Sequence, residues 1–238
     1  MIPVGGLPEI EEGADLGELV AAHARLEDGD VLVVAQKAVS KAEGRVVRLV
    51  DVDPSEEARE LAVGQDPRHL EVILRETERI VRARPPLVIA ETKHGFVCAS
   101  AGVDASNAPA PDTLVLLPRD PDASAAAIRD RIRELTGRSV GVVVSDSFGR
   151  AFRNGIAGVA IGVAGITPLI DLRGRRDRNG YELHATVIAV ADEIASAAEL
   201  VMGKLDAIPA AVVRGLDVTG EGSARELVMP PERDLFGR

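Results

Sequence analysis

The chain has 238 residues, of which 46% are hydrophobic and 28% are charged, a balance typical of a globular protein with a sizeable core. Its formal net charge of −10 and its aromatic content of 2% argue against nucleic acid as a partner, because that binding needs basic surface and stacking rings. A single cysteine excludes an internal disulfide, and the longest run of apolar residues and glycine, 155–166, is too short to span a membrane.

Short β-branched runs predict the strands, and proline-marked caps predict the starts of the helices. Strands are expected, in chain order, over 31–35, 46–50, 87–90, 96–100, 140–144 and 209–213. Asp53-Pro54-Ser55-Glu56, Asp66-Pro67 and Asp120-Pro121 each place a capping carboxylate before a proline and predict three helix starts. Apolar spacing extends the second of these helices as far as Val81, and Gly137 ends the third. A longer periodic face predicts a helix from about 182 to 202.

The order of these elements predicts an α/β fold with a mixed sheet and flanking helices, because strands and helices mix without strict alternation. No repeat or long polar linker divides the chain, so residues 1–238 are expected to form one domain. The proline-rich piece 107–111 is the best candidate for a joint between two subdomains. The glycines at 155, 158, 162 and 165 indicate either bare backbone facing a ligand or, more commonly, two backbones packed closely together.

Charge is unevenly distributed along the chain. Between residues 138 and 178, seven arginines face three aspartates, a local excess of four positive charges in an acidic protein. Such a basic island is a candidate binding site for a small anion, such as a phosphate or a carboxylate. The alternative is a solvated surface rich in arginine.

Two polar loops follow predicted strands. One carries Asp104 with Ser106 and Asn107, and the other carries Asp146 and Ser147. If the two aspartates converge, their oxygens suit Mg²⁺ or Mn²⁺; otherwise each caps a turn.

Cationic side chains that suit a phosphate lie near these loops in the sequence. Arg150 and Arg153 would neutralise a phosphate held by such an ion. Lys37 and Lys41 fit either a phosphate site or a solvated surface. The chain has neither a P-loop nor a Rossmann glycine motif, so any nucleotide must be held in another way.

Five blocks of sequence carry a resemblance to a known family. GDVLVVAQKAVSKAEGR, SAGVDASN, SDSFGRAFRNGIAGVAIG, ADEIASAAELVMGK and VVRGLDVTGEGSARE together resemble the coenzyme F420:L-glutamate ligase family, also called F420-0 gamma-glutamyl ligase. The resemblance covers nearly the whole chain. It implies a GTP-dependent amide ligase that adds L-glutamate to the lactyl carboxylate of coenzyme F420-0 through an acyl phosphate, and then adds further γ-linked glutamates. It also implies a mixed α/β fold outside the P-loop class, a homodimer, and two ions of Mg²⁺ or Mn²⁺, with K⁺ as a further candidate. A cytoplasmic protein without membrane partners is expected on separate grounds, because the chain has no long apolar run and does not open with a charged segment followed by a cleavage signal.

The resemblance also assigns residues. Asp104 and Asp146 match the ligands of one metal ion, and Ser147 matches a hydroxyl that contacts a second. Arg150 and Arg153 would then clamp the phosphate or the acidic substrates. The positions that match the nucleotide site are Leu7, Pro8, Glu9, Ile10, Gln36, Lys41, Asn107, Met202, Gly203, Lys204, Asp206 and Ile208.

Two of these positions depart from the family pattern. Gln36 stands where some members have a small hydroxyl residue, and Lys204 stands where archaeal members offer a glutamate to the second metal. Either Asp206 substitutes for that glutamate or the lysine charge replaces the ion. The rival functions are a metal-dependent phosphoryl-transfer ligase with a different acid acceptor and a non-catalytic nucleotide-binding protein. The chain is either a standalone ligase or the N-terminal part of a fusion with a nitroreductase-like domain.

Overall fold

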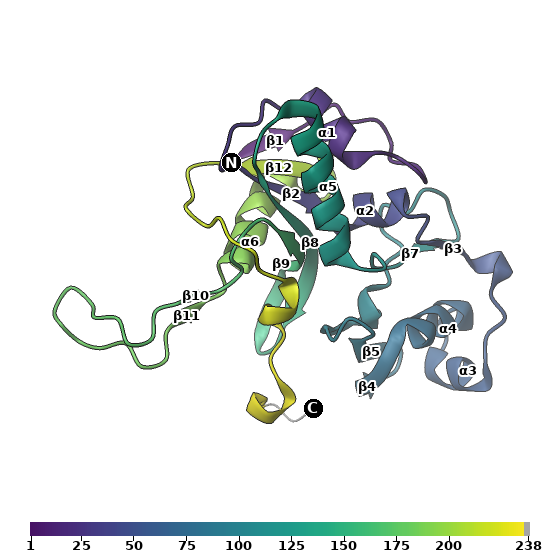
Figure 1. Cartoon of the computed structure of the whole chain (residues 1–238). Coiled ribbons are helices and arrows are strands. Elements are labelled where there is room, and N and C mark those ends of the chain that lie inside the picture. The colour runs from purple at the N-terminus through teal and green to yellow at the C-terminus, as the bar shows by residue number, and fades with distance from the viewer. Residues whose placement is uncertain (236–238) are drawn as a thin grey trace.

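A five-stranded mixed sheet forms the centre of the protein (Figure 1). The computed structural model describes residues 1–235. The strand order is β1-β12-β2-β8-β9, and within this sheet β2 and β8 are parallel while the other neighbours are antiparallel. The bounds are β1 (Ile2–Val4), β2 (Val31–Ala35), β8 (Gly141–Arg150), β9 (Arg153–Ala164) and β12 (Ala210–Val213). This architecture confirms the predicted mixed α/β fold.

Helices cover both faces of this sheet. Leu32 and Val34 belong to a core shared with three helices, whereas Val31 and Val33 belong to a second core shared with a fourth helix. The first three are α1 (Leu16–His23), α2 (Gln36–Ala42) and α5 (Pro121–Thr136), and the fourth is α6 (Val190–Met202). Because β2 and the first four residues of β8 are buried on both sides, these stretches are continuous apolar runs rather than alternating ones.

A smaller lobe lies beside the central sheet (Figure 1). It consists of an antiparallel three-stranded sheet and two helices that share a core containing Leu70, Ile73 and Val88. Its elements are α3 (Glu56–Ala62), α4 (Pro67–Glu76), β4 (Thr77–Arg84), β5 (Leu87–Thr92) and β6 (Val97–Ala99). The pair β3 (Val46–Arg48) and β7 (Thr113–Val115) is antiparallel and joins the chain on either side of this lobe. The predicted joint at 107–111 lies just before β7 and stays a prediction.

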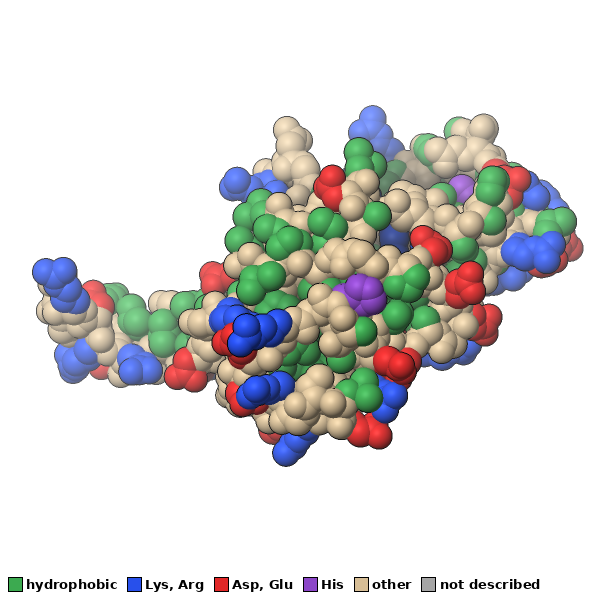
Figure 2. All heavy atoms as spheres, turned by 90° about the horizontal axis from the view of Figure 1, so that it is seen from above, with side chains coloured by type: hydrophobic (Ala, Val, Ile, Leu, Met, Phe, Trp, Pro, Cys, Tyr) green, Lys and Arg blue, Asp and Glu red, His purple; other side chains and the backbone are tan. Residues whose placement is uncertain are grey.

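Short elements complete the structure. Single-turn 3₁₀ helices span Leu49–Asp51, Ser100–Gly102, Ala224–Leu227 and Pro231–Arg233. The strands β10 (Ile170–Asp171) and β11 (Val187–Ile188) pair at the base of an arm that projects from the body. Figure 2 shows basic side chains at the end of this arm. Within residues 1–235, no helix has the length and apolar character needed to cross a membrane.

Local signals located the helix ends at several positions. Asp66 accepts a hydrogen bond from the Arg68 amide at 2.9 Å, and Asp120 accepts one from the Ala123 amide at 3.1 Å, so both cap helices as predicted. Gly137 ends α5 in the left-handed conformation with φ of 71°. In the first helix start, Ser55 rather than Asp53 is the cap, because the Ser55 side chain accepts from Ala58.

Several other element boundaries also differ from the sequence prediction. The helix expected to reach Val81 ends at Glu76, because Thr77–Arg84 pairs with β5 instead. The helix expected from about 182 begins at Val190, because the preceding residues form one side of the arm. The strand expected over 140–144 continues to Arg150, since β9 pairs with it along that length. The strand predicted over 46–50 ends at Arg48.

Two glycines of β9 allow close packing against helices on opposite faces. A Cβ added at Gly158 would lie 2.8 Å from the Ala195 carbonyl oxygen of α6, and one at Gly162 would lie 2.2 Å from the Pro121 carbonyl oxygen of α5. Both distances are too short for a methyl group. Of the two interpretations of these glycines, the structure therefore supports backbone packing, and Gly158 also lines the cavity described below.

Candidate functional site

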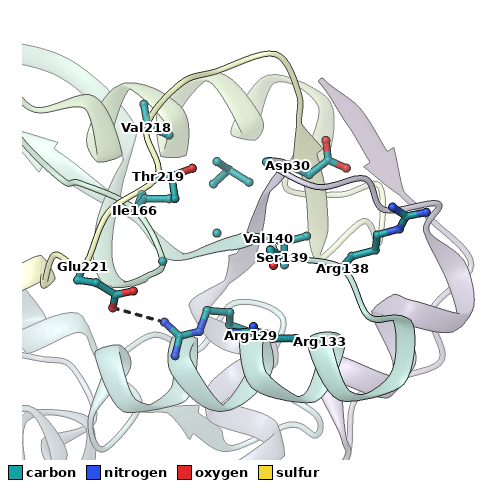
Figure 3. A pocket seen from close by; sticks show the side chains of 14 residues that line it. Asp30, Arg129, Arg133, Arg138, Ser139, Val140, Ile166, Val218, Thr219 and Glu221 are labelled. Atoms are coloured by element: carbon teal, nitrogen blue, oxygen red, sulfur yellow. Dashed lines mark ion pairs between the residues drawn. The ribbon is translucent and has the colours of Figure 1, made fainter.

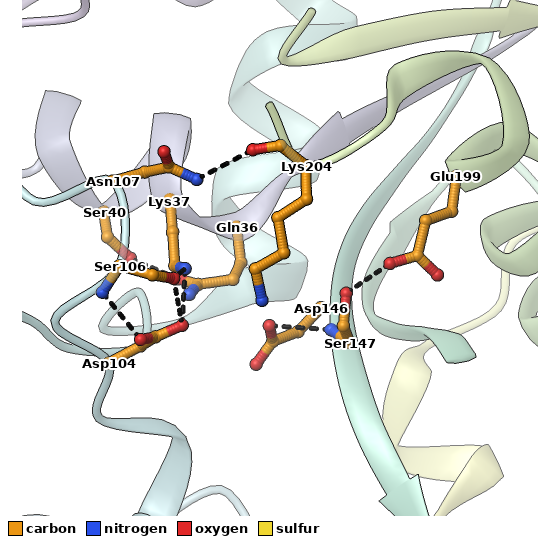
Figure 4. Close-up of polar contacts among 10 residues, drawn as sticks. All are labelled: Gln36, Lys37, Ser40, Asp104, Ser106, Asn107, Asp146, Ser147, Glu199 and Lys204. Carbon is orange, nitrogen blue, oxygen red and sulfur yellow. Dashed lines mark hydrogen bonds and ion pairs between the residues drawn. The ribbon is translucent and has the colours of Figure 1, made fainter. Parts of the chain in front are cut away.

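A polar cavity lies where the parallel strands β2 and β8 end side by side. Ala35, the last residue of β2, is paired with Ser145 of β8, and the cavity of about 110 Å³ opens beyond this pair. Loops at the carboxyl ends of parallel strands are the usual ligand sites of open α/β sheets. The ionisable side chains that line this cavity are Lys37, Asp104, Asp146, Glu199 and Lys204, and the hydroxyl side chains are Ser145 and Ser147. Figure 4 shows all of them except Ser145.

Asp104 enters the cavity from the loop before β7. Its amide and carbonyl groups both bond to Val115, which fixes its backbone. The Lys37 ammonium donates to Asp104 Oδ2 at 2.5 Å and to Ser106 Oγ at 2.6 Å, while the Ser106 amide donates to Asp104 Oδ1 at 2.7 Å. Burial by itself raises the pKa of Asp104, but the bonds from Lys37 and Ser106 outweigh it and hold the pKa below its usual value. The carboxylate is therefore ionised and already faces a cation.

Asp146 enters the same cavity from β8. Its carboxylate accepts a hydrogen bond from the Ser147 amide at 2.8 Å, and no other hydrogen bond reaches it from the described part of the chain. Burial raises the pKa of Asp146 to about 6; the neighbouring Asp104 charge acts in the same direction, whereas Lys37 and Lys204 oppose it. A carboxylate that is buried and poorly solvated is well suited to receive a further cation.

A third carboxylate, Glu199 of α6, completes the polar wall. Ser147 Oγ donates to Glu199 Oε1 at 2.5 Å, and Figure 4 shows the Lys204 side chain pointing toward Asp146. The carbonyl oxygen of Lys204 accepts from Asn107 Nδ2 at 3.3 Å. Sequence reasoning missed Glu199, because it lies beside the apolar stripe of a helix and nothing local shows that this side faces β8.

A larger groove of about 400 Å³ adjoins the cavity. The two share the lining residues Ala35, Lys37, Asn107 and Lys204, so they form one continuous depression. Lys41 is ion-paired with Glu9 at the groove wall. The residues predicted for the nucleotide that line this groove are Leu7, Pro8, Glu9, Ile10, Lys41, Asn107, Lys204 and Ile208.

The remaining predicted nucleotide residues lie elsewhere. Gln36 and Met202 line the small cavity rather than the groove. Gly203 and Asp206 line neither, and the Asp206 carboxylate instead folds back over Gly203, where an added Cβ would lie 2.0 Å from Asp206 Oδ2.

The arginines predicted as a phosphate clamp lie away from the cavity. Arg150 and Arg153 are paired at the tip of the β8–β9 hairpin and are exposed. Arg150 is four positions beyond Asp146 on β8, so their Cα atoms are about 13 Å apart along the extended strand. The structure thus brings the two aspartates to one cavity but does not bring these arginines to it, and their role stays a prediction.

The seven arginines between residues 138 and 178 do not form a single anion-binding site either. Arg138 lies at the opposite ends of β2 and β8, where it pairs with Asp28 and lines a different pocket together with Arg129 and Arg133 (Figure 3). The four arginines between 173 and 178 are exposed on the arm. Chain proximity of these arginines was therefore no guide to spatial proximity.

The donor set of the cavity suits hard cations. Within residues 1–235, no three His, Cys, Asp or Glu side chains gather closely enough to form a metal cage. The oxygens of Asp104 and Asp146 nevertheless face one cavity, as Mg²⁺ or Mn²⁺ would need, with phosphate oxygens and water as further ligands. Ser147 and Glu199 offer a second pair of oxygens beside them.

Comparison with known proteins places the chain among relatives of one kind. The family described as F420-0:Gamma-glutamyl ligase matches residues 6–215. The coenzyme F420:L-glutamate ligase of Methanopyrus kandleri is 48% identical over 252 residues, which is 98% of this chain and 100% of the relative. The proteins of the same name from Archaeoglobus fulgidus and Methanocaldococcus jannaschii are also 48% identical, over 241 and 229 residues. The match to the Archaeoglobus fulgidus protein covers 100% of this chain and 96% of the relative. The match to the Methanocaldococcus jannaschii protein covers 94% of this chain and 91% of the relative.

Proposed function

The chain belongs to the F420-0:Gamma-glutamyl ligase family, and we propose that it joins L-glutamate to coenzyme F420-0 through an amide bond in coenzyme F420 biosynthesis. The reaction we propose uses GTP, proceeds through an acyl phosphate and extends the product with γ-linked glutamates. A carboxylate does not condense with an amine unaided, so transfer of a phosphoryl group first gives it a good leaving group.

One observation carries this proposal: two carboxylates, Asp104 and Asp146, and two ammonium groups, Lys37 and Lys204, line a cavity that opens into a groove. The groove, about 400 Å³, is large enough for a nucleotide, with its terminal phosphates at the shared residues. A polyphosphate needs cations around it and anionic groups that hold a divalent ion beside it. The combination is expected of a phosphoryl-transfer site rather than of a simple anion site.

The residues of the chain have distinct tasks in this scheme. Lys37 and Lys204 offset the charge of the phosphoryl group, and Lys41 can exchange its Glu9 partner for a phosphate. Asp104 and Asp146 would hold Mg²⁺ or Mn²⁺, with Ser147 and Glu199 available to a second ion and K⁺ left as a further candidate. When bound, the ion supplies positive charge beside the phosphates.

The direct test is mass spectrometry of F420-0 incubated with the protein, GTP, L-glutamate and Mg²⁺ or Mn²⁺. We expect one or more glutamyl mass increments, and inorganic phosphate release from GTP only when both F420-0 and glutamate are present. Phosphate release with neither substrate, or no increment under any condition, would contradict the proposal. Asp146→Asn separates catalysis from structure, because we expect it to abolish turnover while leaving the fold intact.

The proposed assembly is a cytoplasmic homodimer. The arm around β10 and β11 projects from the body (Figure 1), and Tyr181, next to its turn at 177–180, is 64% exposed; both features support a partner-binding role. Light scattering after gel filtration measures the mass directly. A monomer at micromolar concentration would contradict the dimer without affecting the ligase proposal.

A further inference from the structure

A second cleft, of about 440 Å³, lies where the smaller lobe meets the central sheet. It is bounded by the turn between β5 and β6, the start of α5, β9 and the 3₁₀ helix Ala224–Leu227. It shares no lining residue with the cavity or the groove of the candidate site. We call it the Lys93 cleft; the lining residues that matter here are Lys93, His94, Phe96, Arg119, Pro121 and Arg225.

Three cations at the Lys93 cleft have no anionic partner. Within residues 1–235, the side chains of Lys93, Arg119 and Arg225 take part in no hydrogen bond or ion pair, and all three are exposed. The carboxylates beside them are already engaged. Asp122 accepts from the Val163 and Ala224 amides and from Ser223 Oγ, and Asp120 accepts from the Ala123 amide.

This arrangement differs from that of many other arginines of the chain, which are ion-paired. Arg131, for example, lies within 4 Å of three carboxylates. Lysine and arginine side chains that line a cleft without a direct ion-pair partner attract a phosphate or a carboxylate, and arginine can bind such a group through two parallel hydrogen bonds. The carboxylates of Asp120 and Asp122 line the same cleft, so the local excess is one positive charge.

Aromatic rings form one wall of the Lys93 cleft in a chain that has only four phenylalanines and no tryptophan. His94 stacks on Phe96 with ring centroids 5.8 Å apart, and Phe96 meets the edge of Phe148 at 6.3 Å. His94 Nε2 lies 2.9 Å from the Pro118 carbonyl oxygen and 3.2 Å from that of Arg119. Since both partners are carbonyls, Nε2 donates, and this contact fixes the loop that carries Arg119.

We propose that the Lys93 cleft binds a phosphorylated compound that carries a planar ring, with the phosphate on the three cations and the ring against Phe96. A flat aromatic wall favours a planar guest, and the cations favour its anionic group. The preformed wall and the fixed loop reduce the ordering cost of binding.

The position of the cleft suggests which substrate of the proposed function it serves, and this step rests on that function. Phe148, which touches Phe96, lies two residues from Asp146 on β8, so both side chains are on the same face about 7 Å apart along the strand. An extended molecule can therefore reach from the cleft toward the cavity. The nucleotide has its own groove, so the cleft serves the ring-bearing end of the F420-0 acceptor.

The test uses riboflavin 5′-phosphate as the probe, followed by its fluorescence, with inorganic phosphate as competitor. We expect binding to the wild-type protein, at least about 10-fold weaker binding to the Arg119→Gln/Arg225→Gln double variant, and displacement by phosphate. Arg84→Gln is the matched control, because Arg84 is exposed on β4, away from the Lys93 cleft. Asp146→Asn should bind the probe normally. No binding to the wild type, or equal binding to the double variant, would overturn the site.

A second measurement decides the assignment to the acceptor. In the ligation assay, the double variant should raise the KM for F420-0 at least about 10-fold while leaving the KM for GTP unchanged. An unchanged KM for F420-0 would overturn that assignment. A wild-type protein that binds the probe but forms no glutamyl product would instead contradict the proposed function, and the probe titration would still establish the cleft.

Discussion

The buried carboxamide of Gln36 offers a sharp test of the candidate site. This side chain is 2% exposed at the cavity wall; its Oε1 accepts from Ser40 Oγ at 2.9 Å, while its Nε2 has no partner in the described part of the chain. Exchanging the amide oxygen and nitrogen would pair Nε2 with Ser40 but leave Oε1 alone instead. A buried polar atom without a partner costs about 1–3 kcal/mol. Such a group is expected where a ligand supplies the missing partner.

The perturbation is the double variant Gln36→Met/Ser40→Ala, which replaces both polar partners with apolar groups of similar size. Removing the unpaired atom gains about 1–3 kcal/mol and removing the Ser40 bond loses about 1 kcal/mol, so the ligand-free protein should be stabilised by about 1 kcal/mol. In a chain of this length that raises the melting temperature by about 2–4 °C. A hydrogen bond to a charged phosphate is worth about 1.5–3 kcal/mol, so GTP should bind about 10- to 100-fold more weakly.

Thermal unfolding without ligand and calorimetric titration with GTP measure the two effects. Ser40→Ala alone is the control: it should destabilise the protein by about 1 kcal/mol and leave GTP affinity unchanged. A double variant that melts below the wild type, or that binds GTP as tightly, would refute the reasoning. A lower melting temperature would mean that the Gln36 carboxamide is satisfied without a ligand, and unchanged affinity would mean that it makes no hydrogen bond to the nucleotide.

Three further predictions concern other parts of the fold. Burial raises the pKa of Asp146 from 3.8 to about 6, so its ionisation destabilises the metal-free protein fully above pH 6 and not at all below the unfolded value. Asp146→Asn should therefore raise the melting temperature at pH 7.5, and this difference should shrink as the pH falls from 6 and vanish below 3.8; a constant difference would contradict the prediction. Hydrogen bonds from Ser55, together with Arg75, lower the pKa of Glu71 from 4.5 to about 2. The ionised Glu71 side chain therefore contributes fully to the free energy of unfolding above pH 4.5, and this contribution is lost toward pH 2. In urea unfolding, Glu71→Gln should cost about 1 kcal/mol at pH 7 and nothing near pH 2, and an equal loss at both would argue against the bond. Gly162→Ala should destabilise by at least about 2 kcal/mol because its methyl would meet the α5 backbone, whereas Gly149→Ala, with nothing within 4 Å, should be neutral; equal stabilities would refute the close packing.

Much of the fold could be predicted from local sequence signals. A capping carboxylate before proline at Asp120 and a glycine at 137 specified α5 at both ends, because capping depends on residues within one turn. The apolar run of β2 was recognisable for a similar reason, since a strand buried on both faces needs no partner to show its character. The blocks of family resemblance span both the fold and the site, and the matches over residues 6–215 confirmed the family.

The parts of the fold that local signals did not predict depend on pairing between distant segments. Helical spacing continued past Glu76, yet the chain there forms β4, because its hydrogen bonds go to β5. The polar end of β8 was expected to be a loop, but pairing with β9 keeps it extended. In both cases tertiary hydrogen bonding overrode a local preference worth only a fraction of a kcal/mol per residue.

The candidate site divides in the same way. Asp104 and Asp146 could be singled out from the sequence by their positions after strands, and the fold brings both to one cavity. The ion pair between Lys37 and Asp104 and the bond between Ser147 and Glu199 could not be predicted, and Arg150 lies elsewhere than its nearness in the chain suggested. The sequence by itself determined that Asp104 and Asp146 are candidate ligands, because each is a polar residue placed shortly after a predicted apolar strand. Only the tertiary structure decided which residues lie together, because that depends on the register between β2 and β8, 110 residues apart, and on which side of α6 faces the sheet.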